Sequence, residues 1–169
     1  DSSVTGVQTC ALPISSAVML YGMSLLYGIT NSTLLSEIGT ALGEEVTAIR
    51  ALAVLFVVIG FAFKVSAVPF HTWAPDTYEG APTPVTAFLS VASKAAGFVA
   101  LLTVVYVAFP GSHEVWQPVF WILSALTMTV GNAMALRQSN VVRMLAYSSV
   151  AQGGFILMPL AVAGTNDAA

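Results

Sequence analysis

The sequence predicts an all-α protein built as a polytopic bundle of about five transmembrane helices. Of its 169 residues, 57% are hydrophobic and only 8% are charged, whereas roughly 25% of the residues of a soluble domain are charged. The mean hydropathy is +0.85, and the apolar runs approach the roughly 20 residues that a helix needs to cross a bilayer. Alternating ten-residue segments typical of membrane strands do not occur. We therefore expect an integral, multi-pass membrane protein.

The apolar runs define the domain organisation. They are expected to form a transmembrane bundle over residues 15–163, with spans at 15–29, 51–70, 85–109, 119–136 and 144–163. Residues 1–14 differ in character from the rest of the chain and lack the features of a signal peptide, so we expect a non-native or disordered leader there. The first span is short, and its beginning is expected to be missing or altered. Residues 164–169 are expected to form a tail.

Charge and cysteine content exclude several classes of partner. The net charge is −3 with five basic residues, so no cationic patch is expected for nucleic acid. The single cysteine, Cys10, excludes an internal disulfide and a cysteine metal site, and we expect an inert thiol. Arg137 and Arg143 follow the fourth span, whereas only Arg50 follows the first. The positive-inside rule therefore predicts that the connections after the second and fourth spans face the cytoplasm.

Two lysines lie inside predicted spans. At 1.5 Å per residue, Lys64 and Lys94 lie roughly 10 Å and 15 Å from the connection between them. An ammonium group at the bilayer centre costs at least about 2.5–3.5 kcal/mol, so such a lysine usually faces the bundle interior or a hydrated cavity. Desolvation and mutual repulsion would ease proton release from both. We expect the pair to relay protons; the alternative is that the long side chains snorkel to the interface.

The connection between these spans carries four prolines, Pro69, Pro75, Pro82 and Pro84. Proline removes an amide donor and disfavours helix in the residue before it. We therefore expect no helix within residues 69–88, an end of the second span near Pro69 and a start of the third near Pro84. Broken helices at membrane depth are tolerated where they line a cavity, as in transporters.

Three titratable residues lie in the same connection. His71 titrates near neutrality, which makes it a candidate proton relay between solvent and the second span. The alternative is an interfacial aromatic belt with Trp73 and Tyr78. Asp76 and Glu79 are expected to be solvated loop acids or helix-start caps.

The fifth predicted span opens with polar side chains, Tyr147, Ser148, Ser149 and Gln152. Hydroxyl and amide groups can hold a chain of water, and they can equally serve as contacts between closely packed helices. The sequence shows no metal-ligand cluster, phosphate-binding loop, nucleophile elbow or dinucleotide-binding glycine pattern. We therefore expect no cofactor in this chain and no site for covalent catalysis.

Two stretches carry a resemblance to a known family. GFAFKVSAVPFHTWAPDTYEGAPTPVTAFLSVASKAAGF, residues 60–98, and RMLAYSSVAQGGFIL, residues 143–157, resemble the subunit N family of respiratory NADH-quinone oxidoreductases, also called chain 2. The likeness covers nearly all of residues 15–163. Sister subunits and cation/proton antiporter chains share the lysines and the break but differ in the surrounding residues.

The resemblance implies part of an antiporter-like fold with a discontinuous helix. It implies that Lys64 accepts and releases a proton at the broken helix and that Lys94, on the next helix, passes protons along a polar axis. His71 lies within the stretch that resembles the family, which favours a role for it in proton transfer. Gln152 stands where relatives have histidine or glutamine. The glutamate partner and the exit lysine that the family implies do not occur in this stretch.

The resulting hypothesis is a membrane-arm subunit of NADH-quinone oxidoreductase that translocates protons coupled to quinone reduction in respiratory electron transport. It would be a translocase subunit without a redox site of its own, in a bacterial inner membrane. Its expected partners are other membrane-arm subunits, lipid, protons and water, and not nucleic acid. The alternatives are a subunit of a cation/proton antiporter and a membrane scaffold without proton conduction.

Overall fold

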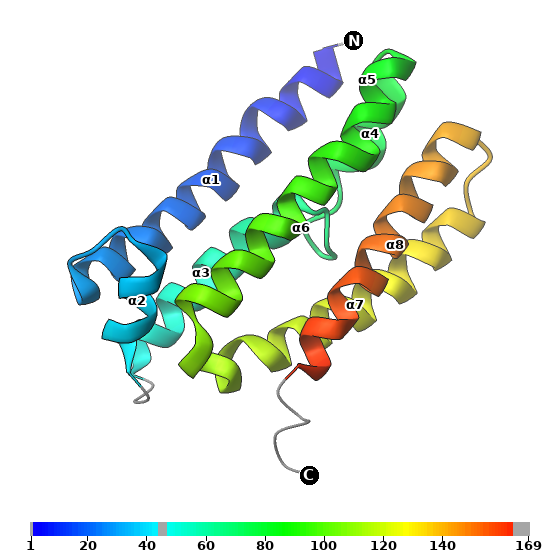
Figure 1. Ribbon diagram of the computed structural model, residues 1–169. Coiled ribbons are helices and arrows are strands. Elements are labelled where there is room, and N and C mark those ends of the chain that lie inside the picture. Colours follow the sequence, from blue (N-terminus) through cyan, green and yellow to red (C-terminus); the bar gives the residue numbers. More distant parts are fainter. Residues whose placement is uncertain (1, 44–46, 164–169) are drawn as a thin grey trace.

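The chain folds into a bundle of long helices that run roughly side by side (Figure 1). The computed structural model describes residues 2–43 and 47–163, with side chains from residue 13 onward. No strand occurs among these residues, so the all-α prediction is confirmed. In chain order the elements are α1 (Ser2–Thr30), α2 (Leu35–Leu42), α3 (Ala48–Lys64), α4 (Trp73–Gly80), α5 (Thr83–Phe88), η1 (Leu89–Ser93), α6 (Lys94–Thr103), η2 (Val104–Ala108), η3 (Pro110–Ser112), α7 (His113–Leu136) and α8 (Val141–Val162).

Four stretches of helix are long and apolar enough to cross a membrane. They correspond to the predicted first, third, fourth and fifth spans, and they are Pro13–Thr30, Thr83–Ala108, Pro110–Leu136 and Val141–Val162. The second predicted span differs, because α3 has only 17 residues and is continued by α4 after an interruption. The bundle therefore combines four long helices with one discontinuous helix.

The two ends of the chain are described only in part. Residues 2–14 belong to α1, so the backbone of the expected leader is helical; that these residues are foreign to the native protein stays a prediction. The side chain of Cys10 and the predicted tail at 164–169 lie outside the described residues.

The discontinuous helix corrects two sequence predictions. α3 ends at Lys64 rather than near Pro69, and α4 forms where no helix was expected. Pro69 lacks an amide donor and disfavours helix in the preceding residue, and Ser66 adopts a left-handed φ of 61°, so the helix ends early. Pro75 lies in the first turn of α4, where amide groups have no partner within the helix, and it is harmless there. The predicted start of the third span is confirmed, since α5 begins at Thr83.

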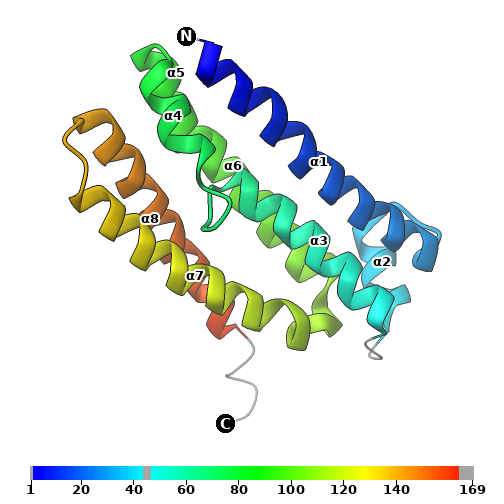
Figure 2. The same ribbon diagram turned by 180° about the vertical axis from the view of Figure 1, so that it is seen from behind.

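The break between α3 and α4 lies about halfway along the bundle, not at its end (Figures 1 and 2). Side chains from elsewhere satisfy its backbone. The indole Nε1 of Trp73 donates to the carbonyl of Phe63 at 3.0 Å, and the amide of Val68 donates to Thr127 Oγ1 on α7 at 2.9 Å. An unpaired backbone group at membrane depth costs several kcal/mol. These two hydrogen bonds therefore explain how the interruption is tolerated.

The third span contains two π-helical turns. Leu89–Ser93 forms η1 and Val104–Ala108 forms η2, both within one continuous helical stretch. A π turn adds a residue to a turn and rotates the side chains beyond it, and such turns are frequent at functional sites. Lys94 is the first residue after η1.

Close packing of α7 and α8 depends on small residues. A Cβ atom at Gly131 would lie 2.9 Å from the backbone nitrogen of Ala151, and one at Gly154 would lie 2.8 Å from the backbone nitrogen of Met128. Ser124 Oγ donates to the carbonyl of Gly154 at 2.8 Å. Small residues and hydroxyl groups are the usual contacts between membrane helices that approach closely. Gly131 of α7 and Gly154 of α8 therefore serve in helix packing.

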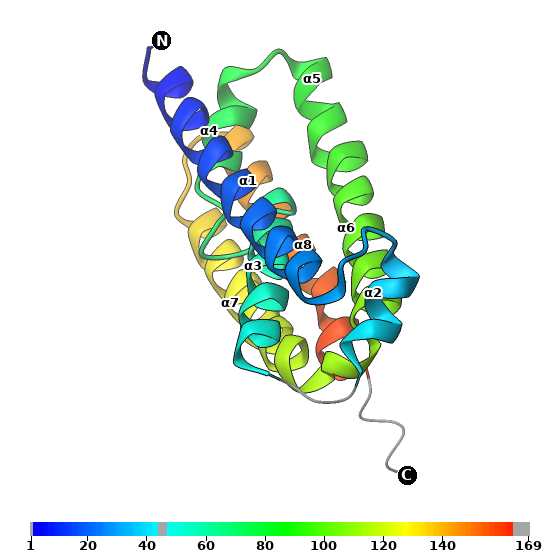
Figure 3. The same cartoon turned by 90° about the vertical axis from the view of Figure 1, so that its left-hand side faces the viewer.

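A buried arginine, Arg50, holds together the end of the bundle at which α2 lies. Arg50 is only 2% exposed and lies in the first turn of α3, not in a solvated loop. Its guanidinium donates to Ser112 Oγ at 2.7 Å and to the carbonyls of Leu42 and Gly43 at 2.8 and 3.0 Å. It thereby ties the end of α2 to η3, and Figure 3 shows α2 beside the lower end of the third span.

The connections after α4 and after α7 lie at the same end of the bundle (Figure 1), as the predicted topology requires. Arg137 and Arg143, the basic residues on which the predicted orientation rests, lie at that end of the bundle. The assignment of this end to the cytoplasm stays a prediction.

Candidate functional site

Lys94 is a buried cation near the middle of the third span. Its side chain is 6% exposed. The ammonium Nζ donates to Ser149 Oγ at 2.8 Å and to the carbonyl of Ser149 at 3.0 Å. These bonds link α6 to α8 in the interior of the bundle. Burial within the bundle, expected from the sequence, therefore holds for this lysine, and snorkelling to the interface does not apply to it.

An aromatic ring from the discontinuous helix completes the surroundings of Lys94. Tyr78 on α4 is 3% exposed, and Nζ of Lys94 lies 5.8 Å from its ring centroid. A cation over an aromatic face is stabilised by the ring quadrupole. The ion pairs among the described residues involve only Arg143, so Lys94 has neutral partners there. Three elements, α4, α6 and α8, thus meet at one ammonium group.

A cavity of about 240 Å³ opens beside this ammonium. Ser90, Lys94, Ser149 and Gln152 contribute its polar groups, and Phe98 and Ile156 contribute apolar walls. A cavity of this size with several polar groups can hold water. Of the polar side chains that the sequence offered as a water-holding set, Ser149 and Gln152 therefore lie together beside Lys94.

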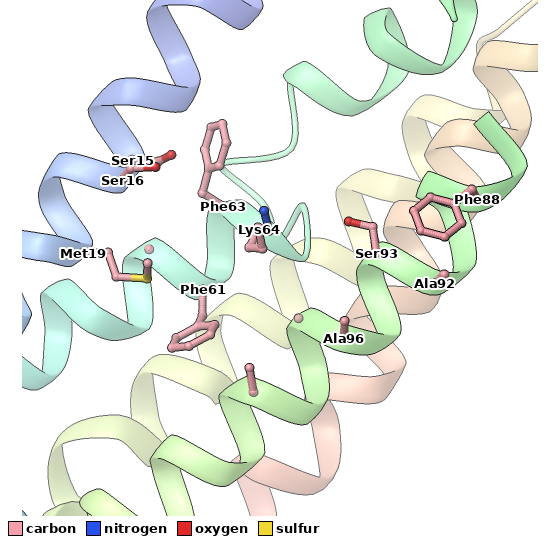
Figure 4. Close-up of a pocket in the computed structure, with 13 residues that line it drawn as sticks. Ser15, Ser16, Met19, Phe61, Phe63, Lys64, Phe88, Ala92, Ser93 and Ala96 are labelled. Carbon is pink, nitrogen blue, oxygen red and sulfur yellow. The ribbon is translucent and has the colours of Figure 1, made fainter. Parts of the chain in front are cut away.

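Lys64 lines a second, larger cavity of about 410 Å³ between α1, α3 and the third span. As the last residue of α3, it lies at the break. Its side chain is exposed in this structure, and within the described part of the chain no carboxylate pairs with it. Figure 4 shows its amine pointing into the cavity, with the hydroxyl of Ser93 directed toward it from the opposite wall.

The two lysines therefore line different cavities, although their helices touch. A Cβ atom at Gly97 of α6 would lie 3.2 Å from Cγ1 of Val65 and 3.6 Å from Cγ of Lys64. Lys64 and Ser93 line the larger cavity. Lys94, the residue that follows Ser93 in the chain, lines the smaller one. The third span thus forms a wall shared by both cavities.

His71 lies in the break and is half-buried. Its ring centroid is 6.1 Å from that of Tyr147 on α8. The ring lies near the carbonyl of Pro69, yet Nδ1 is buried and has no hydrogen-bond partner of suitable geometry among the described residues. Of the other two members of the expected belt, Trp73 donates across the break to Phe63 and Tyr78 faces Lys94. These contacts lie within the bundle; the relay role of His71 and the interfacial-belt alternative both stay predictions.

Unpartnered polar atoms gather at the discontinuous helix. Within the described residues, the buried side-chain atoms without a hydrogen-bond partner are Ser66 Oγ, His71 Nδ1 and the Tyr78 hydroxyl, although the Tyr78 hydroxyl lies near Ser149. Buried polar groups are nearly always paired with protein or ordered water. Their concentration at the break indicates a region suited to buried water.

Asp76 and Glu79 are partly exposed, and Asp76 lies in the first turn of α4, but both acids are ion-paired rather than free in a loop. Arg143 Nη1 donates to Asp76 Oδ1 at 2.8 Å and to Glu79 Oε2 at 2.7 Å. Asn140 Nδ2 donates to Glu79 Oε1 at 2.7 Å. Sequence reasoning missed these ion pairs, as it missed Tyr78 and Thr127, because the partners lie far apart in the chain and no local pattern brings them together.

The chain matches a known family of membrane proteins over most of its length. A sequence profile of the family described as NADH:quinone oxidoreductase/Mrp antiporter, TM, matches residues 7–169. The chain belongs to this family. NADH-quinone oxidoreductase subunit N of Moorella thermoacetica is 52% identical over 146 residues, which are 86% of this chain and 31% of that relative. The chain thus spans about a third of the length of this relative.

Chains in solved structures of membrane complexes share the arrangement of helices. Respiratory complex I from Thermus thermophilus contains a chain that matches with a TM-score of 0.78 and 36% identity, over 94% of this chain and 34% of that one. The Mrp complex from Dietzia matches with a TM-score of 0.86 over 96% of this chain and 30% of that one. At 24% identity, the second likeness shows the fold alone. The antiporter-like fold and multi-pass membrane location predicted from the sequence are confirmed.

Proposed function

We propose that this chain is the proton-carrying part of a membrane-arm subunit of NADH-quinone oxidoreductase, a translocase that couples quinone reduction to proton translocation in respiratory electron transport. Identity of 52% with a subunit N and likeness to a chain of complex I support this choice within the family. The proposed location is a bacterial inner membrane, where other membrane-arm subunits would surround the chain.

The observation that carries the proposal is the environment of Lys94. This lysine is buried and is held by a serine hydroxyl, a backbone carbonyl and an aromatic ring. Each of these partners is neutral, so loss of a proton from Lys94 would leave no unpaired charge behind among them. A lysine fixed by a carboxylate would be held in its charged form. The site is therefore built for an amine that changes its protonation state.

The proposed path runs from the break to Lys94. Lys64 would take up a proton in the cavity that it shares with Ser93, and His71 is a further candidate carrier in the break. Water held by the unpartnered groups there would carry the proton toward Lys94. From Lys94, Ser149 and Gln152 would hold water in the second cavity; glutamine can orient water but carries no charge.

The redox chemistry is proposed to lie in other subunits. The sequence has one cysteine and neither a phosphate-binding loop nor a dinucleotide-binding glycine pattern. This chain would thus bind no NADH, flavin or iron–sulfur centre, and it would contribute proton conduction alone.

The test is replacement of Lys94 in the full-length subunit, assembled into its complex and reconstituted in vesicles. Lys94→Ala and Lys94→Met remove the amine, and we expect proton pumping to fall by at least about tenfold, as for loss of a positioned acid or base. Arg137→Gln, which removes an exposed cation at the end of the bundle, is the control. Undiminished pumping in both Lys94 variants would refute the relay.

The second candidate is a subunit of a cation/proton antiporter, which the family description, NADH:quinone oxidoreductase/Mrp antiporter, favours. Such a protein would exchange sodium for protons without a redox partner. Sodium-dependent proton uptake in vesicles that contain no electron donor would support it. A membrane scaffold, the remaining alternative, requires normal pumping after Lys64 and Lys94 are both replaced by methionine.

A further inference from the structure

Arg143 forms a cluster that lies outside the proposed proton path. Its members, which we call the Arg143 cluster, are Arg143 and Asn140 at the start of α8 and Asp76 and Glu79 on α4. One guanidinium nitrogen, Nη1, binds both carboxylates, and Asn140 binds the second oxygen of Glu79. Asn140 also caps α8 by accepting from the amide of Val142. The cluster thereby joins the second half of the discontinuous helix to a fixed helix start.

The same stretch of α8 contacts the proposed path further along. Counting from Arg143, Tyr147 lies one turn on and contacts the His71 ring, and Ser149 binds Lys94. On α4, Tyr78 lies between the two carboxylates in the chain and faces Lys94. The Arg143 cluster thus joins α4 to the start of α8. Further along, side chains of the same two helices contact the ammonium of Lys94.

α4 needs such a contact to hold its place. It has eight residues, and isolated helices shorter than about 12–15 residues are marginal in water. On one side it follows the non-helical residues 65–72, and on the other only Ala81 and Pro82 separate it from α5. Without Arg143, the carboxylates of Asp76 and Glu79 would face each other at i and i+3 and repel.

Stability alone does not account for the cluster. The side chains of Arg143, Asp76 and Glu79 are 31%, 38% and 41% exposed, and ion pairs this exposed contribute little to folding. Two carboxylates, one of them also held by the amide of Asn140, nevertheless fix the guanidinium in one geometry. The cluster therefore suits positioning better than general stabilisation.

We propose that Arg143 is a positioning residue for Lys94, acting through α4 by holding the ring of Tyr78 against the ammonium group. The proposal rests on the proposed function, since Lys94 must carry protons for its position to matter. Arg143 itself carries no proton in this scheme. Its positive charge is needed to hold two carboxylates, so another cation at the same position should serve in part.

The experiment compares matched variants of the full-length subunit in the assembled, reconstituted complex. Arg143→Gln removes the cluster cation, and Arg137→Gln removes an exposed cation at the same end of the bundle. Arg143→Lys keeps a cation at position 143 that can reach both carboxylates. For each, the amount of assembled complex, kcat and KM for quinone, and protons pumped per electron pair are measured.

We expect the Arg143→Gln complex to assemble at normal levels, with kcat and pumping reduced severalfold, no more than for loss of the Tyr78 ring itself. KM for quinone should stay unchanged. Arg137→Gln should resemble the unmodified complex, and Arg143→Lys should keep most of the rate. Equal behaviour of Arg143→Gln and Arg137→Gln would overturn the proposal, and so would an assembled Arg143→Lys complex as slow as Arg143→Gln.

Two further arms keep the outcome decisive. If Arg143→Gln does not assemble, Asp76→Asn and Glu79→Gln replace it, each leaving one ion pair; unchanged pumping in both would overturn the proposal. Lys94→Met, measured alongside, separates the two proposals. Undiminished pumping in Lys94→Met refutes the relay itself, whereas a defect there with none in the Arg143 variant refutes only the role of Arg143.

Discussion

The ammonium group of Lys94 binds Ser149 twice, through the hydroxyl at 2.8 Å and through the backbone carbonyl at 3.0 Å. The carbonyl belongs to the backbone of α8 and stays whatever residue stands there. Only one of the two bonds can therefore be removed by substitution. Substitution of Ser149 should therefore have an effect on pumping intermediate between that of no change and that of loss of Lys94.

Replacement of Ser149 by alanine should slow pumping without abolishing it. The lost hydroxyl removes one hydrogen bond to a charged group, worth about 1.5–3 kcal/mol, while the carbonyl still accepts from Lys94. We expect a fall of about tenfold in pumping rate, less than for Lys94→Met in the same assay. Ser148→Ala, a change of the neighbouring hydroxyl, is the control. Equal effects of the two serine variants would contradict a specific role for Ser149.

Replacement of Tyr78 separates the ring from the hydroxyl. Tyr78→Phe keeps the ring against Lys94 and removes a hydroxyl that has no hydrogen-bond partner in the described structure, so pumping should stay near normal. Tyr78→Leu removes the ring and should lower the rate severalfold, because a cation over an aromatic ring gains about 0.5–2 kcal/mol. A larger defect in the phenylalanine variant than in the leucine variant would instead assign the role to the hydroxyl.

Sequence reasoning was accurate where a pattern is local. Hydropathy located the third and fifth spans within three residues, because each is an uninterrupted apolar run, and it placed the end of the fourth correctly but its start nine residues late. It also located Lys94 inside the bundle, since a cation in the middle of such a run must face protein or water. Pro84 correctly indicated the start of the third span.

It failed where distant segments decide the outcome. The prolines predicted a break but not its depth, because the depth depends on Trp73 and Thr127 supplying hydrogen bonds to a backbone that the prolines leave open. Treating residues 69–88 as a surface connection hid α4 altogether. Asp76 and Glu79 consequently read as solvated acids, although Arg143, 64 to 67 positions away, pairs with both.

Replacement of Thr127 by valine should destabilise the break. The Thr127 hydroxyl accepts from the buried amide of Val68, and valine leaves that amide unpaired at a cost of about 1–3 kcal/mol. We expect faster hydrogen exchange at residues 65–72 in the detergent-solubilised complex. Thr129→Val is the matched control, since that hydroxyl is exposed and donates only to the carbonyl of Ala125 on its own helix. Exchange that is equally slow in both variants would contradict the assignment.

Replacement of Gly131 by alanine should loosen the contact between α7 and α8. A Cβ atom there would lie 2.9 Å from the nitrogen and 3.0 Å from the Cα of Ala151, and because these are backbone atoms, α8 must shift as a whole. Overpacking of this kind costs about 1–3 kcal/mol, and it would move Ser149 relative to Lys94. We expect a lower melting temperature of the complex together with reduced pumping. Gly28→Ala is the control, because nothing lies within 4 Å of a Cβ atom at Gly28 and alanine favours helix by about 1 kcal/mol over glycine. If Gly131→Ala kept both the melting temperature and the pumping rate of the Gly28 control, the packing of α7 on α8 would not be what holds Ser149 in place.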